Sequence, residues 1–206
     1  MEISLVQSTK EPIKTISNIA SICYDSNPDD PIKLVKHLYK NGHHSVFEHI
    51  YFTFKIEGIS RACSHQLIRH RMCSFTQRSQ RYCSENEFEY ITPPSIEKDD
   101  MLFYNYIYSA KQDRENYQNL TKYGVKNEDA RYILPNACST DLYLSCNLRE
   151  LIHICNERLC SRAQWEIREL VKKMVELVDP ELRFMLVPKC KSGRIICNSP
   201  CSQKGE

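Results

Sequence analysis

Glycine is scarce in this sequence. Only five glycines occur among the 206 residues: Gly42, Gly58, Gly124, Gly193 and Gly205. They lie too far apart to build the Gly-rich turn of a dinucleotide-binding fingerprint or a P-loop, so both motifs are excluded. A bound phosphate therefore has to be held by side chains and by ordinary helix ends.

Long apolar runs and a strong net charge are also missing. No apolar stretch reaches transmembrane length, and Met1-Glu2-Ile3 does not begin a signal peptide. The 28 Lys and Arg residues nearly balance the 26 Asp and Glu residues, whereas proteins that coat nucleic acid usually show a stronger basic excess. We therefore expect no membrane and no nucleic-acid partner, and only local binding of anions.

Cysteine is frequent, but its distribution argues against a disulfide scaffold. The eleven cysteines are an odd number, and many of them lie within apolar patterns where reduced cysteine acts as a small core residue. This distribution favours the reducing cytoplasm. Near the C-terminus, Cys190, Cys197 and Cys201 are spaced too widely for a typical zinc site, and three ligands would leave a structural site incomplete.

The hydrophobic patterning predicts a single α+β domain in which helices pack with an antiparallel or mixed sheet. Phe52, Phe54 and Ile56 alternate with polar residues, as in a half-buried strand. Asp30-Pro31 has the form of a helix start, and Gly42 marks a helix end. The expected strands are 3–6, 47–57 and 142–146, and the expected helices are 13–23, 31–41, 60–70, 99–122, 127–132 and 147–178.

The last of these helices carries the clearest start signal. Asn147-Leu148-Arg149-Glu150 has the form of a capping box, with Asn as the cap and Glu three residues later. The apolar periodicity that follows predicts one long helix to Val178, closed by Asp179-Pro180.

Residues 66–82 form the most informative stretch of the chain. It holds four arginines and a histidine together with glutamines and serines, and it contains no carboxylate. Such a cluster repels itself unless an anion or acidic groups from elsewhere lie among the guanidiniums. Guanidinium groups bind phosphate oxygens two at a time, and neighbouring amides can recognise a polar ring edge. A solvated basic loop is the alternative, but the mixture of residues favours a ligand site.

Three other groups of residues could carry chemistry. His43, His44 and His49 suggest a metal, yet they lack the His-Glu-x-x-His spacing, and neutral hydrogen-bonded histidines are far more common. Cys73 and Cys83 lie beside arginines that would lower their thiol pKa, but no base is paired with either one, so neither is assigned catalysis. The third group can be a second cationic face or ordinary surface charge; it comprises Arg131, Asn147, Arg149, His153, Arg158 and Arg162.

Together these motifs resemble the signature of the flavin-dependent thymidylate synthases. The central match is Arg69-His70-Arg71, followed after seven residues by Ser79 and then by Arg81-Tyr82. The remaining matches keep the family's order: His43, Phe47-Glu48-His49, Gln66, Ala130-Arg131, Leu134-Pro135, Asn147-Leu148-Arg149, Arg158 and Ala163-Gln164-Trp165-Glu166-Ile167. The resemblance covers residues 1–187 as one domain and leaves 188–206 as a Cys/Lys-rich tail.

The resemblance implies a homotetrameric α+β enzyme with active sites shared between subunits. It implies an FAD-dependent methyltransferase of dTMP biosynthesis, which methylates dUMP with 5,10-methylenetetrahydrofolate as the one-carbon donor and NADPH as the reductant of the flavin. Arg158 is the implied catalytic residue, because its guanidinium would favour the N3-deprotonated uracil and polarise the C5–C6 bond.

The resemblance also assigns ligands to individual positions, with His43 near the flavin and folate and no metal ligand anywhere. The implied FAD contacts are Ser45, Arg69, His70, Arg71, Gln77, Asn147, Leu148, Arg149 and His153. The implied dUMP contacts are Gln66, Leu67, Ile68, Arg69, Gln77, Arg78, Ser79, Gln80, Arg81, Arg131 and Arg158.

The chain departs from the family pattern at a few positions. Gln77 stands where a glutamate is also found, His153 replaces a frequent asparagine, and Arg162 replaces a frequent histidine. An Arg-rich nucleic-acid-binding module remains the alternative function; it would use the arginines on phosphates, with Phe75 and Tyr82 stacking on bases.

Overall fold

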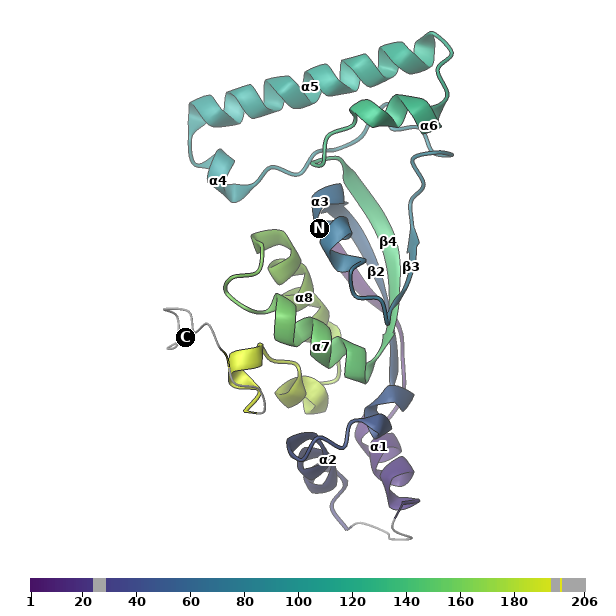
Figure 1. Ribbon diagram of the computed structural model, residues 1–206, viewed down its shortest axis with the longest axis vertical. Helices are drawn as coiled ribbons and strands as arrows, with labels where there is room; N and C mark the ends of the chain where they lie inside the picture. Colours follow the sequence, from purple (N-terminus) through teal and green to yellow (C-terminus); the bar gives the residue numbers. More distant parts are fainter. Residues whose placement is uncertain (24–28, 194–196, 198–206) are drawn as a thin grey trace. The chain divides into compact units, whose positions relative to one another are not determined.

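A computed structural model describes residues 1–23, 29–193 and 197 (Figure 1). The chain has a mixed α/β architecture with an antiparallel sheet, as the patterning predicts. The strands are β1 (Glu2–Ser8), β2 (Tyr51–Ser60), β3 (Ser74–Gln77) and β4 (Ser139–Asn147), in the sheet order β1-β2-β4-β3. The α-helices are α1 (Pro12–Ser21), α2 (Pro31–Lys40), α3 (Arg61–Leu67), α4 (Pro94–Glu97), α5 (Asp100–Lys122), α6 (Asn127–Ala130), α7 (Leu148–Arg158) and α8 (Trp165–Leu177). Short 3₁₀ helices are η1 (Ser45–His49), η2 (Arg131–Ile133), η3 (Pro180–Met185) and η4 (Lys189–Lys191).

The residues divide into two compact units. Unit 1 comprises Met1–Glu2, Glu57–Gln66 and Thr76–Leu142, and unit 2 comprises Ile3–Ile56, Leu67–Phe75 and Tyr143–Glu206. The expected boundary between a domain at 1–187 and a tail at 188–206 stays a prediction. Within the tail, Cys190 is exposed and Cys197 is partly exposed, whereas Cys201 lies outside the described residues.

Helices α7 and α8 supply much of the core of unit 2, where they pack against each other (Figure 1). Each buries one apolar stripe at helical spacing, as the sequence periodicity predicts. The prediction of one helix over 147–178 is wrong, because the chain leaves the helix after Arg158. The side-chain oxygen of Gln164 then accepts hydrogen bonds from the backbone N–H groups of Glu166 and Ile167 and starts α8 as a new helix. Arg168 donates to the carbonyl oxygen of Ser161 within the break, at 2.7 Å.

Other boundaries also differ from the expected ones. Residues 45–49 form the turn η1, so the strand predicted from 47 begins at Tyr51 as β2. The helix expected at 60–70 ends at Leu67, which leaves the Arg-His-Arg segment outside regular structure. The prediction of a helix at 99–122 is confirmed by α5, whose cap Asp99 accepts from the N–H groups of Met101 and Leu102.

Among the described residues, no helix is both long enough and apolar enough to cross a membrane.

Candidate active site

The residues singled out by the sequence fall into both units, and each group has its own geometry. In unit 1 they follow β3, where the chain leaves the sheet. Gln77, the last residue of β3, donates from its amide to the hydroxyls of Ser64 (3.0 Å) and Thr140 (3.2 Å). The amide is therefore already fixed by groups on α3 and β4.

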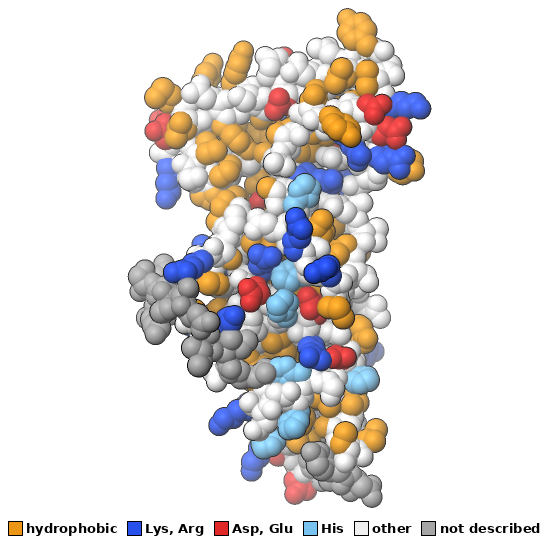
Figure 2. All heavy atoms as spheres, in the orientation of Figure 1, with side chains coloured by type: hydrophobic (Ala, Val, Ile, Leu, Met, Phe, Trp, Pro, Cys, Tyr) orange, Lys and Arg blue, Asp and Glu red, His pale blue; other side chains and the backbone are white. Residues whose placement is uncertain are grey.

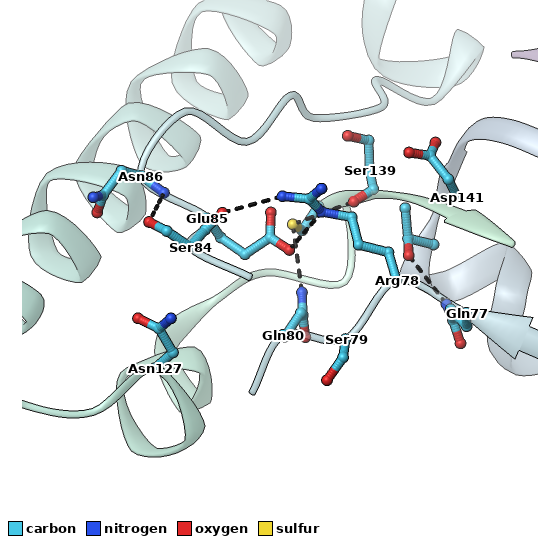
Figure 3. A network of polar contacts seen from close by, with 12 residues as sticks. Gln77, Arg78, Ser79, Gln80, Ser84, Glu85, Asn86, Asn127, Ser139 and Asp141 are labelled. Carbon is cyan, nitrogen blue, oxygen red and sulfur yellow. Dashed lines mark hydrogen bonds and ion pairs between the residues drawn. The ribbon is translucent and has the colours of Figure 1, made fainter. Parts of the chain in front are cut away.

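Arg78 is engaged with a carboxylate that the sequence analysis did not identify (Figure 3). Its Nε lies 3.3 Å from Oε1 of Glu85, and its terminal nitrogen donates to the carbonyl oxygen of Ser84 at 3.2 Å. The Glu85 side chain is 5% exposed. Burial raises the pKa of Glu85, and the neighbouring guanidiniums of Arg78 and Arg61 partly offset that increase. Arg78 thus links the two ends of the loop from 78 to 85.

Gln80 lies beneath the same loop, in the interior of unit 1. It is 8% exposed, and its amide points to Sγ of Cys138 at 3.7 Å (Figure 3). Burial raises the pKa of Cys138 to about 12, so this thiol stays protonated at neutral pH. The side chain of Gln80 supports the loop from inside, and its backbone remains the part that a ligand could contact.

Glu128 contacts two more of the arginines singled out by the sequence, Arg81 and Arg131. Its Oε2 accepts from both Nε and a terminal nitrogen of Arg81, at 3.1 and 2.9 Å. Its backbone carbonyl accepts from Nε of Arg131 at 3.0 Å. Arg81 and Glu128 also line an open hollow of about 470 Å³. Ser79 stands at the base of this segment, where its hydroxyl accepts from the backbone N–H of Arg81.

Unit 2 brings together the Arg-His-Arg segment and α7. His70 is 5% exposed, and its Nε2 accepts a hydrogen bond from Nε of Arg158 at 3.0 Å. Its Nδ1 lies 3.6 Å from Oε1 of Glu150, and its ring packs edge-on against His153 with centroids 5.6 Å apart. Two segments separated by more than eighty residues, both named by the sequence analysis, therefore meet at His70.

The electrostatics keep His70 neutral. Burial, followed by the nearby Arg158 and His153, lowers the pKa of His70 from 6.5 to about 4. A neutral imidazole carries one ring proton, and because Nε2 accepts from Arg158, that proton is on Nδ1. His70 thus acts as an acceptor for Arg158.

His70, Glu150 and His153 also form the one metal-type cluster among the described residues, with their ligand atoms within 4.8 Å of one another. The position of the His70 ring proton argues against a metal ion in this cluster. Nε2 of His70 is already an acceptor, so Nδ1 must keep its proton and has no lone pair to offer a metal. His43, His44 and His49 do not belong to this cluster.

The start of α7 confirms the predicted cap. The Asn147 side chain accepts from the N–H of Glu150 at 2.9 Å. The backbone N–H of Leu148 donates to the carbonyl of Ile50, and Arg149 forms an ion pair with Glu48 of η1. The carboxylate of Glu150 contacts His70, a role that its place in the capping box did not reveal.

The remaining candidate residues differ in how far their side chains are exposed to solvent. Arg69, Arg71, His43 and Ser45 are exposed, and Ile68 is 40% exposed. Leu67 is fully buried, so only its backbone could reach a ligand. Gln66 is partly exposed at the end of α3.

Three acidic partners were missed by the sequence analysis: Glu85, Glu128 and Glu150. Each lies outside the Arg-rich stretch, which itself contains no carboxylate. The need for acidic groups from elsewhere was evident from the sequence, but 26 acidic residues were available and nothing in the pattern identified these three.

Comparison with known proteins supports the same interpretation. The family model described as "Thymidylate synthase complementing protein" matches residues 4–182. A flavin-dependent thymidylate synthase of Pyrococcus abyssi is 40% identical over 190 residues, covering 85% of this chain and 78% of the relative. The enzyme of the same description from Clostridium tetani is 36% identical over 222 residues, covering 94% and 89%.

A solved structure matches over nearly its whole length. It is the flavin-dependent thymidylate synthase of Helicobacter pylori, complexed with FAD and dUMP. The TM-score is 0.76 at 26% sequence identity, and the match covers 90% of this chain and 98% of that one. The chain belongs to the family of flavin-dependent thymidylate synthases.

Proposed function

We propose that this protein is a flavin-dependent thymidylate synthase that converts dUMP to dTMP. 5,10-Methylenetetrahydrofolate would donate the one-carbon unit, and NADPH would reduce the flavin. The observation that carries the proposal is the Arg158–His70 contact, which joins the two motifs that define the family resemblance. Support also comes from the Helicobacter pylori relative, which binds FAD and dUMP.

The residues of unit 2 fit an FAD site. The cofactor's pyrophosphate is anionic, and Arg69, Arg71 and Arg149 are exposed cations close in sequence to His70 or to the start of α7. Helix α7 has 11 residues, and the positive end of its dipole lies at Leu148 and Arg149. This arrangement needs no Gly-rich loop. The proposed FAD contacts are Ser45, Arg69, His70, Arg71, Gln77, Asn147, Leu148, Arg149 and His153, with His43 on the folate side.

Bound FAD would supply the hydride chemistry, and the protein's own groups bind, orient and polarise. Arg158 would lie beside the uracil, where a fixed positive charge stabilises the N3-deprotonated ring and polarises C5–C6. Its Nε–H is bound to His70, which fixes the plane of the guanidinium. Since His70 is neutral, it does not weaken the positive charge that Arg158 presents.

The loop after β3 would hold the nucleotide. Arg81 and Arg131 supply cations for its phosphate, and Ser79 supplies a hydroxyl. The full set of proposed dUMP contacts is Gln66, Leu67, Ile68, Arg69, Gln77, Arg78, Ser79, Gln80, Arg81, Arg131 and Arg158. The nucleic-acid-binding alternative is weaker, because the 28 Lys and Arg residues of the chain are nearly balanced by 26 Asp and Glu residues.

A homotetramer is part of the proposal. Helix α5 buries only Ala110 and Tyr117 within the chain. Its N-terminal half leaves five large side chains exposed: Met101 (70% exposed), Leu102 (51%), Phe103 (40%), Tyr104 (69%) and Tyr108 (60%). Figure 2 shows hydrophobic side chains gathered over this helix. Such a face on a long helix is typical of a subunit interface.

The first test is the visible absorption spectrum of the purified protein, followed by an assay of dUMP-dependent NADPH oxidation and dTMP formation. We expect a yellow protein that releases FAD on denaturation. Arg158→Ala should lower kcat by at least about 100-fold, whereas Lys172→Ala, which removes an exposed cation on α8, should not change it. A colourless protein that does not bind added FAD would refute the proposal, and full activity in Arg158→Ala would refute the role of Arg158.

A further inference from the structure

Glu150 is a buried acidic residue for which the proposed chemistry has no role. It is 8% exposed, on the first turn of α7. The helix start needs only its backbone N–H, which donates to Asn147. Its carboxylate points elsewhere, with Oε1 at 3.6 Å from Nδ1 of His70. Burying a carboxylate is costly unless a partner compensates, so this placement calls for an explanation.

The proton positions supply one. Arg158 donates Nε–H to Nε2 of His70, which requires the His70 proton to be on Nδ1. Nδ1 is the atom that faces Glu150. Glu150, His70 and Arg158 therefore form a chain in which every contact joins an N–H to an acceptor atom. The separation between Nδ1 and Oε1 is longer than a hydrogen bond, so the attraction is between the carboxylate charge and the N–H dipole.

We infer that Glu150 is a positioning residue, which keeps His70 in the Nδ1–H tautomer and thereby holds the guanidinium of Arg158 in its working orientation. The inference rests on the proposed function only for the consequence in turnover. The same division of labour is found where a buried carboxylate orients a histidine that in turn serves a reacting group.

The alternative tautomer shows what Glu150 prevents. With the proton on Nε2, an N–H of His70 would face the N–H of Arg158, and two donors would oppose each other. Arg158 would then have to leave its position. Nδ1, without its proton, would face the Glu150 carboxylate with its lone pair, which is also unfavourable. The carboxylate therefore destabilises the wrong tautomer as well as stabilising the right one. The other titratable side chain at this place, His153, is on the same helix as Glu150, and its ring meets that of His70 in a T-shaped arrangement.

The test uses Glu150→Leu, Glu150→Gln and the full-length protein loaded with FAD. Leucine removes the acceptor, whereas glutamine keeps an oxygen acceptor without the charge. The matched control is Glu157→Leu, an exposed glutamate on the same helix. The first readout is the ¹⁵N spectrum of histidine-labelled protein, with the His70 signals assigned by their loss in His70→Gln. The second readout is kcat and KM for dUMP at saturating FAD.

For Glu150→Leu we expect a mixture of His70 tautomers and a kcat lowered about tenfold or more, with KM for dUMP changed less than about threefold. Glu150→Gln should restore the Nδ1–H tautomer and much of the kcat, and Glu157→Leu should match the wild type in both. A Glu150→Leu protein with the wild-type tautomer and the wild-type kcat would overturn the inference. If Glu150→Leu does not fold, Glu150→Asp, which draws the carboxylate away from the ring, decides by the same readouts. A wild-type protein that makes no dTMP would refute the proposed function alone, since the tautomer spectrum does not depend on turnover.

Discussion

The Arg78–Glu85 pair allows a sharp test of what stabilises the loop from 78 to 85. Breaking a buried ion pair by removing one partner typically costs about 3–5 kcal/mol, because the other charge is left uncompensated. Here the Glu85 side chain is 5% exposed, but that of Arg78 is 41% exposed, and Arg61 still attracts the carboxylate. We therefore expect Arg78→Met to lower the free energy of unfolding by about 2 kcal/mol. For a chain of this length, that corresponds to a fall in Tm of about 4–8 °C.

The pH dependence of this loss identifies its cause. Without Arg78, burial holds the pKa of Glu85 even further above its unfolded value, so the folded state binds a proton more readily than the unfolded state. The deficit of Arg78→Met relative to the wild type should be full at pH 7 and should shrink as the pH falls through the raised pKa of Glu85. Urea unfolding at pH 7 and pH 5 measures this difference.

Two further variants complete the test. The double variant Arg78→Met/Glu85→Gln no longer buries the Glu85 carboxylate and should regain more than half of the lost stability. Arg81→Met breaks a more exposed pair, with side chains 52% and 36% exposed, and should cost less than about 1 kcal/mol. Equal deficits at both pH values, or a double variant as unstable as Arg78→Met, would show that the loop is not stabilised by charge compensation.

Two other predictions concern unit 2. Asn147→Ala removes the side-chain cap of α7 and should destabilise the protein by about 1 kcal/mol in denaturant unfolding. Asn147→Asp keeps an acceptor and should be close to the wild type in stability. Equal stability of all three proteins would contradict the capping role. Because the pKa of His70 is lowered from 6.5 to about 4, the unfolded chain binds more protons than the folded one between these values, so stability should fall as the pH falls through this window. In urea unfolding at pH 7 and pH 4.5, His70→Gln should lose less stability at the lower pH than the wild type does. The control His65→Gln, at an exposed position of α3, should behave like the wild type. The same loss of stability in all three proteins would contradict the lowered pKa of His70.

Local patterns predicted most of the elements that carry the site. Alternation at Phe52, Phe54 and Ile56 located β2, and the Asn147 cap located the start of α7. These signals are local, since side-chain periodicity and caps act within a few residues. The end of α7 was not predictable in the same way. Its apolar spacing runs on into α8, and the break depends on Gln164 starting a new helix, an unusual cap residue.

Local sequence patterns could not identify the residues that contact the site residues. The sequence named Arg78, Arg81 and His70, but not Glu85, Glu128 or Glu150 as the acidic groups that contact them. Arg81 and Glu128 are 47 residues apart, and such pairs are decided by the course of the chain. The turn from β3 into the loop after it also has no periodic signal, because β3 is only four residues long.

Glu128 contacts both Arg81 and Arg131, and this affects how an anion would bind to them. Its carboxylate acts as a resident counter-ion for Arg81, and its carbonyl keeps Arg131 nearby, so two like charges remain assembled before any phosphate arrives. On the proposed function, the phosphate of dUMP would exchange with this carboxylate and would not have to bring the two cations together. Because the pair is largely exposed, the exchange costs at most about 1 kcal/mol, less than a tenfold loss of affinity. On the proposed function, a dianionic phosphate monoester would displace the single carboxylate more readily than an uncharged nucleoside would, so the loop would select its ligand by charge.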